Sequence, residues 1–215
     1  MSYEEGALIE PLSVGIHSCQ RGEVGLGTSV LIMGAGPIGL VCILVAKAMG
    51  AGKIIAVDIN KERLDLAVEM GATGYVNTFI GEEPLELTKR IHKKFDGDTG
   101  DQDLHPQVTM ECSGVESAIQ TSVYATRTGG KVLSIGRGKP IINFPINNAS
   151  AREVDILGVF RYNNTWPKAI SMISSGQIDV SKLVSHRVTL ANALEAFELT
   201  RTGQGVKVMI NCAEE

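Results

Sequence analysis

Short apolar runs alternate along the chain with longer stretches in which apolar residues recur every three or four positions. The run Ser29–Met33 (SVLIM) is apolar after its first residue, and residues 38–49 follow it with the length and spacing of a helix. A second apolar run, residues 53–57, is followed by residues 61–70 with the same helical spacing. This alternation is typical of βαβ units, in which amphipathic helices join buried parallel strands.

The alternation continues through the middle of the chain. We predict further strands at residues 75–77, 108–111, 131–135 and 155–160, and further helices at residues 84–94 and 115–126. Residues 96–107 (DGDTGDQDLHPQ) are polar and rich in turn-forming residues, which predicts an exposed loop. Because parallel strands are joined by right-handed crossovers, the sequence predicts an α/β fold with a doubly wound parallel sheet.

The pattern changes after Arg161. There we predict a helix at residues 166–174, a strand around 187–189, a helix at 190–200 and a strand at 206–210, without regular parallel-sheet spacing. A helix is also expected over residues 4–19. The chain is therefore interpreted as a connecting helix (1–20), a central α/β domain (21–160) and a C-terminal segment (161–215).

Composition and charge exclude several classes of protein. The 215 residues carry 20 basic and 24 acidic side chains without a lysine–arginine cluster, so we expect no nucleic-acid partner. Residues 24–46 are uncharged, but the glycines and the proline within them would break a membrane helix, so we expect no membrane span. The four scattered cysteines form no C-x-x-C pair and the first residues lack a secretory pattern, which favours a reducing, cytoplasmic location.

Residues 34–39 (GAGPIG) form a G-x-G-x-x-G motif between a predicted strand and a predicted helix. In this context the first glycine makes a tight turn, the second lets the backbone approach a diphosphate, and the third allows close contact between helix and strand. Asp58 ends the next predicted strand. An acid at that place accepts hydrogen bonds from ribose hydroxyls and repels a 2′-phosphate, which predicts a Rossmann domain that binds NAD rather than NADP.

The motif also fits two other interpretations. A glycine turn that serves packing alone stays open, as does a methyltransferase that holds the ribose of its cofactor with a similar acid. Short-chain reductases are excluded, because they need a Tyr-x-x-x-Lys pair and no tyrosine of this chain has a lysine four positions later.

No histidine or cysteine has a partner at the spacing of a metal site. The histidines, interpreted as solvated or packed side chains, are His17, His92, His105 and His186. Cys112 and Ser113 follow the fourth predicted strand at the carboxyl edge of the sheet, where ligands of open α/β sheets bind. We therefore expect these two residues to line the cofactor groove.

Several segments together resemble one family. They are residues 5–12 (EGALIEPL), 34–39, 41–50 (VCILVAKAMG), 152–158 (REVDILG) and 160–167 (FRYNNTWP). Along nearly its whole length the chain is similar to the sorbitol dehydrogenase family, the polyol branch of the zinc-containing medium-chain dehydrogenase/reductase superfamily. The resemblance implies NAD-dependent oxidation of a polyol to a ketose, sorbitol to fructose, by zinc-assisted hydride transfer in a cytoplasmic homo-oligomer, a tetramer in the family.

The resemblance also implies roles for residues that match the family's motifs. Those implied to bind or border the cofactor are Gly34, Gly36, Pro37, Ile38, Gly39, Asp58, Arg63, Cys112, Ser113, Ile135, Gly136, Arg137, Val159, Phe160 and Arg161. Asp58 would hold the adenosine ribose, and Arg63 would lie over the adenine. Arg161 and Tyr162 match positions that contact the polyol. Glu10 matches a glutamate beside the catalytic zinc or its bound water, and with Arg161 and Tyr162 it completes the catalytic candidates.

The sequence departs from this family in one respect that concerns the metal. The family's other zinc ligands, a cysteine, a histidine and a second carboxylate, belong to an N-terminal domain that this sequence does not contain. An open zinc site needs three protein ligands, so zinc is doubtful for this chain. Apolar residues that would complete the missing domain are expected to be partly uncovered: Ile170, Ile173, Leu194, Phe197 and Val208.

Two functional hypotheses follow. The first is an NAD-dependent polyol dehydrogenase of which this chain supplies the cofactor-binding half. The second is a dinucleotide-binding module without turnover of its own, a truncated isoform or fragment. The sequence also departs from the family in two local features. The loop over residues 96–107 is longer than usual for the family, and Arg137 stands where an apolar residue is common.

Overall fold

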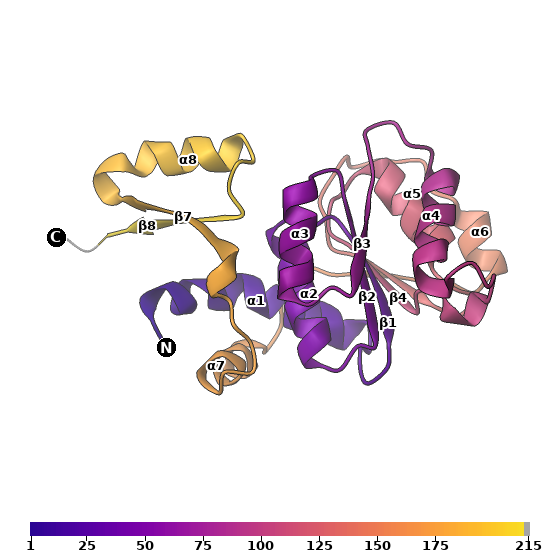
Figure 1. Ribbon diagram of the computed structural model, residues 1–215, viewed down its shortest axis with the longest axis horizontal. Coiled ribbons are helices and arrows are strands. Elements are labelled where there is room, and N and C mark those ends of the chain that lie inside the picture. Colours follow the sequence, from indigo (N-terminus) through magenta and orange to yellow (C-terminus); the bar gives the residue numbers. More distant parts are fainter. Residues whose placement is uncertain (213–215) are drawn as a thin grey trace.

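The computed structural model describes residues 1–212 and arranges six strands in one parallel sheet of order β3-β2-β1-β4-β5-β6 (Figure 1). These strands are β1 (Ser29–Met33), β2 (Lys53–Asp58), β3 (Gly74–Asn77), β4 (Val108–Glu111), β5 (Lys131–Ser134) and β6 (Asp155–Gly158). From β1 the chain winds first outward to β3 and then back past β1 to β4, β5 and β6. The predicted doubly wound α/β fold is confirmed.

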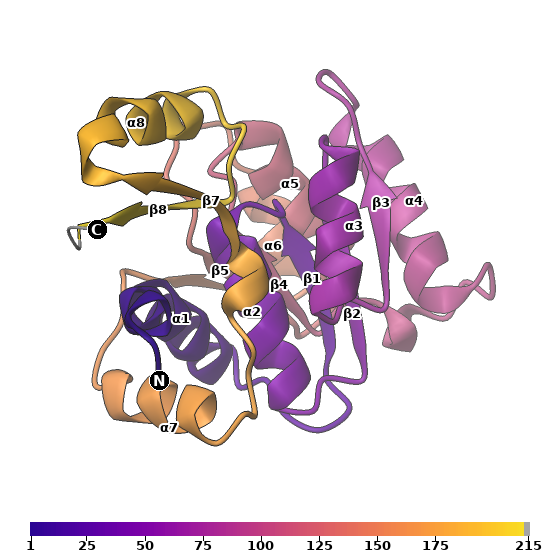
Figure 2. The ribbon, with the colours of Figure 1, turned by 60° about the vertical axis from the view of Figure 1, so that its left-hand side comes forward.

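Helices cover both faces of the sheet. They are α1 (Tyr3–Arg21), α2 (Pro37–Ala48), α3 (Lys61–Met70), α4 (Pro84–Asp96), α5 (Glu116–Ala125) and α6 (Ile146–Ala151), with a 3-10 turn η1 (Gln102–Leu104) before β4. The helices α2 and α3 lie on one face, and α4, α5 and α6 on the other (Figures 1 and 2). The helix α1 packs against α2, and a Cβ at Gly15 would lie 2.9 Å from the Val41 carbonyl oxygen, so glycine permits this close crossing.

The core follows the alternation of side chains along β1. Val30 and Ile32 join the larger apolar cluster, which includes residues of α1 and α2, whereas Leu31 and Met33 join the cluster that includes Ile91 of α4. Successive side chains of a strand point to opposite faces, so a strand covered on both faces is apolar at every position. For this reason the SVLIM run predicts β1 to the residue.

The chain after the large sheet divides into two parts. The first is α7 (Trp166–Ser174), which packs on α1 and buries Ala169 and Ile173. The second follows the 3-10 turn η2 (Ser181–Leu183), and we call it the C-terminal unit, residues 184–211. It consists of β7 (Val184–Thr189), η3 (Leu190–Asn192), α8 (Ala193–Arg201) and β8 (Lys207–Asn211), with β7 and β8 paired in parallel beside α8 (Figure 2).

The apolar residues expected to be uncovered behave differently in these two parts. Ile173 is buried against α1, and Ile170 is 40% exposed. On α8, Leu194 is 84% and Phe197 is 67% exposed, while Val208 of β8 is half-buried. The expectation therefore holds for α8 and fails for Ile173, because α7 has a helix to pack on.

The prediction of an exposed loop over residues 96–107 is wrong for two of its polar residues. The helix α4 continues to Asp96, and both Asp96 and His105 are buried. The His105 ring stacks on His92 with ring centroids 3.6 Å apart, and its Nε2 lies 3.3 Å from Oδ2 of Asp96. These polar groups are buried because they are partners for one another.

Other differences concern the ends of elements. The helix α6 was not predicted, because residues 146–151 (INNASA) form a short segment with two asparagines, which have low helix propensity. The sixth strand ends at Gly158 rather than at Phe160, and α8 begins at Ala193 after a 3-10 turn. Within residues 1–212, no helix has the length and apolar character needed to cross a membrane.

Candidate functional site

The glycine motif forms the turn from β1 into α2. Gly34 has a φ of +96°, a conformation that favours glycine, and its N–H donates to the Val57 carbonyl at 2.8 Å. Gly36 is the N-cap of α2, and Pro37 is the first helical residue. The N–H groups of a first helical turn have no acceptor within the helix, and the positive end of the helix dipole lies there. The turn therefore offers donors to an anion at the carboxyl edge of the sheet.

The second and third glycines of the motif have opposite surroundings. A Cβ at Gly39 would lie 1.9 Å from the Gly34 carbonyl oxygen and 3.2 Å from Cγ2 of Ile32, so Gly39 lets α2 pack closely on its own turn. A Cβ at Gly36 would meet nothing within 4 Å. Gly36 therefore leaves open space on the outer side of the turn, and this space fits a diphosphate that approaches the backbone.

Asp58 connects this turn to the end of β2. Its Oδ2 accepts from the Ala35 N–H at 2.7 Å, and its Oδ1 accepts from the Asn60 N–H at 2.8 Å. The side chain is half-buried, so its outer side reaches solvent. A carboxylate has about four acceptor positions, so both oxygens keep capacity for further donors such as ribose hydroxyls.

The loops after β4 and β5 continue the same edge and interlock through glycines. A Cβ at Gly114 would lie 2.4 Å from the Arg137 carbonyl carbon, and one at Gly138 would lie 1.8 Å from the Gly114 carbonyl oxygen. Ser113 lies against Gly34, where an added Cβ would be 3.2 Å from the Ser113 Cβ. The structure thus brings Ser113 next to the glycine motif and Arg137 next to Gly114.

Glu111, at the end of β4, was missed by the sequence analysis. Its side chain is fully buried, and Oε1 accepts from the Ser113 N–H at 2.9 Å, the Ser113 hydroxyl at 2.5 Å and the Gly114 N–H at 3.0 Å. Burial raises the pKa of Glu111, and these hydrogen bonds oppose the rise. Glu111 thereby holds the loop that carries Ser113. An acid ending a strand just before a Cys-Ser-Gly sequence is the signal that could have revealed it.

Cys112 and Ser113 point in different directions. Ser113 is exposed at the carboxyl edge, whereas the Cys112 thiol packs inward and donates to the Met110 carbonyl at 3.7 Å. A hydrogen bond with the Cys42 thiol and burial together raise the pKa of Cys112 well above its ordinary value. The Cys112 side chain therefore belongs to the core beneath α2.

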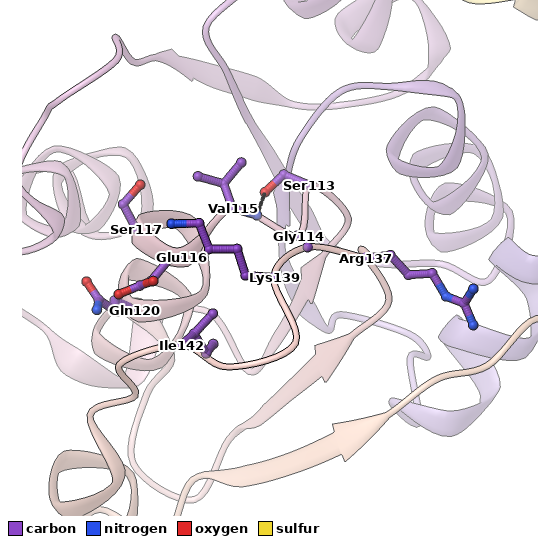
Figure 3. A pocket seen from close by; sticks show the side chains of 10 residues that line it. Ser113, Gly114, Val115, Glu116, Ser117, Gln120, Arg137, Lys139 and Ile142 are labelled. Carbon is purple, nitrogen blue, oxygen red and sulfur yellow. Dashed lines mark hydrogen bonds between the residues drawn. The ribbon is translucent and has the colours of Figure 1, made fainter.

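A cavity of about 590 Å³ opens beside these loops (Figure 3). It is lined by residues 113–117, Gln120, residues 137–139 and Ile142. In Figure 3 the Lys139 side chain lies over this cavity, whereas the Arg137 side chain extends away from it. The Arg137 guanidinium therefore lies at a different part of the carboxyl edge of the sheet.

Arg137 reaches the end of β6, where several predicted site residues meet. Its guanidinium carbon lies 5.0 Å from the centre of the Phe160 ring, and that of Arg161 lies 5.7 Å from the same ring. Arg161 has a φ of +54°, which is uncommon for a residue with a side chain. Tyr162 is half-buried, and its ring lies 6.0 Å from that of Trp166. The structure brings Arg137, Phe160 and Arg161 together.

The remaining predicted cofactor residues are placed by the backbone or by the C-terminal unit. The Ile135 and Gly136 N–H groups donate to the Glu111 carbonyl, and the Val159 N–H donates to the Ser134 carbonyl, so these residues border the edge. Arg63 on α3 donates from Nη2 to the Gly203 carbonyl at 2.9 Å. Its guanidinium therefore contacts the C-terminal unit rather than standing free.

Glu10 does not form a metal centre with other side chains of residues 1–212. It is exposed on α1. Among the residues that the structure describes, no three histidine, cysteine, aspartate or glutamate side chains are grouped to hold a metal ion. The donor set of residues 1–212 thus does not fit the zinc that the resemblance implies.

Comparison with known proteins places this geometry in a family. The profile of the zinc-binding dehydrogenases matches residues 37–175. Sorbitol dehydrogenase from Rattus norvegicus is 50% identical over 212 residues, which are 99% of this chain and 57% of the rat protein. The chain thus spans little more than half the length of the curated relatives it matches.

Solved structures show the same arrangement of elements. An oxidoreductase/dehydrogenase of unknown specificity from Escherichia coli superposes with a TM-score of 0.88 at 31% identity, over 100% of this chain and 59% of that one. L-idonate 5-dehydrogenase from Escherichia coli superposes with a TM-score of 0.84 at 27% identity, over 98% and 57%. With the family profile covering more than half of its residues, the chain belongs to the zinc-binding dehydrogenases.

Proposed function

We propose that this chain is the dinucleotide-binding part of an NAD-dependent polyol dehydrogenase, which oxidises a polyol such as sorbitol to a ketose such as fructose. The observation that carries the proposal is the pairing of an open Gly36 with a carboxylate, Asp58, that is held 2.7 Å from the same turn. The substrate class is taken from the similarity to sorbitol dehydrogenase.

The residues of the turn would hold two parts of the cofactor. The N–H groups of the first turn of α2, at Ile38 and Gly39, would bind the diphosphate, and Asp58 would accept from the ribose hydroxyls. The negative charge of Asp58 would repel a 2′-phosphate, which favours NAD over NADP. Because Ala35 and Asn60 already orient the carboxylate, the ribose would meet an acceptor that needs little rearrangement.

When bound, NAD would supply the hydride acceptor: a carbinol carbon of the polyol would give up a hydride and its hydroxyl a proton, so that ketose, NADH and a proton would result. Ser113, Ile135, Gly136 and Val159 would border the cofactor, and Arg161 and Tyr162 would contact the polyol. We assign no step to zinc, because residues 1–212 do not group three ligands for it. A role for Glu10 beside the metal, a homo-oligomeric state and a cytoplasmic location stay predictions.

A second function is favoured by that same lack of a ligand set in the described chain. In it, the chain binds the dinucleotide and turns nothing over. Two measurements distinguish these functions. NADH binding is measured by the fluorescence of NADH, and NADH production from sorbitol is then followed in the presence of stoichiometric zinc. Binding without production supports the module, and production supports the enzyme.

Gly36→Ala tests the cofactor site itself. Its Cβ would occupy the open space where the diphosphate is proposed, so we expect NADH affinity to fall about tenfold or more while the thermal midpoint stays unchanged. Gly25→Ala is the matched control, since its Cβ also meets nothing within 4 Å and lies outside the turn. Equal NADH affinity of the Gly36→Ala variant and the wild type would contradict the proposed site.

A further inference from the structure

The backbone on both sides of Arg137 is fixed against the loop after β4. A Cβ at Gly136 would lie 2.2 Å from the Gly114 nitrogen, and one at Gly138 would lie 1.8 Å from the Gly114 carbonyl oxygen. These contacts leave no room for a side chain at either neighbour of Arg137, so the two loops pack backbone against backbone. The fold therefore sets the point at which the Arg137 side chain leaves the edge of the sheet.

From that point the Arg137 side chain reaches toward the end of β6. Its guanidinium carbon lies 5.0 Å from the centre of the Phe160 ring, within the range of a cation–π contact. Figure 3 shows the same side chain extending away from the cavity that Lys139 overlies. Because the Phe160 ring is 64% exposed, the contact orients the Arg137 cation without neutralising it.

Arg137 takes part in no ion pair of the described chain. None of the ion pairs formed within residues 1–212 includes it, and its side chain is exposed. A second cation contacts the same ring, since the guanidinium carbon of Arg161 lies 5.7 Å from the centre of Phe160. The positive charge of Arg137 is therefore free to act on a ligand that lies beside it.

The order of the strands relates Arg137 to the proposed cofactor site. Asp58 ends β2, the glycine turn follows β1, and Arg137 follows β5. In the sheet, β1 and β4 stand between β2 and β5. A dinucleotide with its adenosine ribose at Asp58 and its diphosphate at the turn would extend its other half along the carboxyl edge toward β4 and β5. That half carries the nicotinamide.

The two redox states of the cofactor differ in charge at the nicotinamide. The ring of oxidised NAD carries one positive charge, whereas the ring of NADH, which has gained a hydride, is neutral. A cation beside the ring therefore raises the free energy of bound NAD relative to that of bound NADH. The charge of the diphosphate is the same in both states, so it cancels from this comparison.

We propose that Arg137 is a specificity-determining residue that makes this chain bind NADH in preference to oxidised NAD. The inference rests on the proposed function, which supplies the position of the nicotinamide. The guanidinium, oriented by Phe160, disfavours the positive charge of the oxidised ring. A neutral side chain at this place would not distinguish the two states by charge.

The test compares the affinities of the whole chain for the two redox states. NADH and oxidised NAD are titrated by calorimetry into the wild type and into Arg137→Leu, and the ratio of the two dissociation constants is compared. We expect the preference for NADH to be about threefold or more greater in the wild type, since two unit charges a few ångströms apart interact by this much even in water. The difference should shrink as salt is raised, because Arg137 is exposed.

ADP-ribose shows which part of the cofactor Arg137 acts on, because it has the diphosphate but no nicotinamide. We expect its affinity to be the same for the wild type and Arg137→Leu. An equal loss of affinity for ADP-ribose, NADH and NAD in Arg137→Leu would place the guanidinium at the diphosphate and overturn the proposal.

Two further variants assign the effect to the charge of Arg137. Arg137→Lys retains the charge and should retain most of the preference for NADH. Lys139→Leu is the matched control, because it removes one positive charge from the same loop but from a side chain over the neighbouring cavity, and it should leave the preference unchanged. A preference that survives Arg137→Leu, or that falls equally in Lys139→Leu, overturns the proposal.

The same titrations distinguish failure of the proposed function from failure of this inference. If neither NADH nor NAD binds, the proposed cofactor site is rejected, and the role of Arg137 with it. If both bind and their ratio is the same in the wild type and Arg137→Leu, the cofactor site stands and the role of Arg137 alone is rejected.

Discussion

At the scale of single residues, Asp58 has two roles that substitution can separate. It accepts from two backbone N–H groups, which shapes the turn, and it carries the charge that would face a 2′-phosphate. We expect Asp58→Ala to weaken NADH binding and to reduce the preference for NADH over NADPH about tenfold or more, since charges at hydrogen-bond distance near a surface interact by about 1–4 kcal/mol. Titrations of both nucleotides by fluorescence measure this change.

Asp58→Asn is the control for the shape of the turn. It retains one acceptor oxygen while removing the charge, so we expect it to lose most of the preference for NADH with a smaller change in thermal midpoint than Asp58→Ala. If Asp58→Ala left NADH affinity unchanged, Asp58 would not hold the ribose.

The residues that sequence alone could predict are those whose chemistry depends on local spacing. The glycine turn and Asp58 follow from short distances along the chain and from the strand–turn–helix context. His105 could not be predicted in this way. It is a polar residue buried by a partner, and that partner, Asp96, becomes visible only when α4 and the segment before β4 are placed side by side.

At the scale of elements, the histidine stack joins α4 to the segment before β4 and should make stability depend on pH. His92 also donates from Nε2 to the Ala125 carbonyl at 3.0 Å, and it faces His105, Asp96 and Arg152. Burial lowers the pKa of His92 below its ordinary value of 6.5, with His105 and Arg152 adding to the shift and Ala125 and Asp96 opposing it.

The direction in which stability changes with pH follows from which state of the chain, folded or unfolded, binds more protons. Below pH 6.5 the unfolded chain protonates His92 while the folded chain still holds it neutral, so the free energy of unfolding falls as pH falls from that value toward the lowered pKa. We expect a loss of up to about 1 kcal/mol from this residue in urea unfolding between pH 7.5 and 5.5. His92→Gln should flatten the dependence, and His186→Gln, outside the stack, should leave it unchanged. An unaltered slope in His92→Gln would contradict the assignment.

Elements differed in how far the sequence predicted them. Strands covered on both faces, such as β1, leave an apolar run that marks both ends. The helix α6 and the C-terminal unit leave weak patterns, because α6 buries only Ala149 and α8 buries only Ala196. Where few side chains are buried, the sequence carries little hydrophobic periodicity from which an element could be predicted.

At the scale of the whole molecule, polar contacts join the C-terminal unit to helices α1 and α3, while Val184 joins the larger apolar cluster. Arg187 of β7 donates to both carboxylate oxygens of Glu4 at 2.6 and 2.9 Å, and Arg63 donates to the Gly203 carbonyl. Within the unit, β8 has no fully buried side chain and α8 leaves Leu194 and Phe197 exposed. The unit therefore buries much less apolar surface than β1 and its neighbours.

Elements with little buried apolar surface open at lower free energy than the core. We expect amide hydrogens of residues 184–211 to exchange faster than those of β1, β2 and β4, with a separate dependence on denaturant. Glu4→Gln weakens the contact with Arg187 and should speed exchange in the unit several-fold while leaving the large sheet unchanged.

The control for that experiment is Glu195→Gln, an exposed glutamate of α8 outside the ion pairs of residues 1–212. It removes the same charge without touching the contact between the unit and α1, so exchange should stay as in the wild type. Equal exchange in the unit and the sheet would mean that the molecule opens as one body. In that case the contacts of Arg63 and Arg187 would couple the C-terminal unit to the cofactor edge, and Asp58→Ala would then change exchange in β7 and β8 as well.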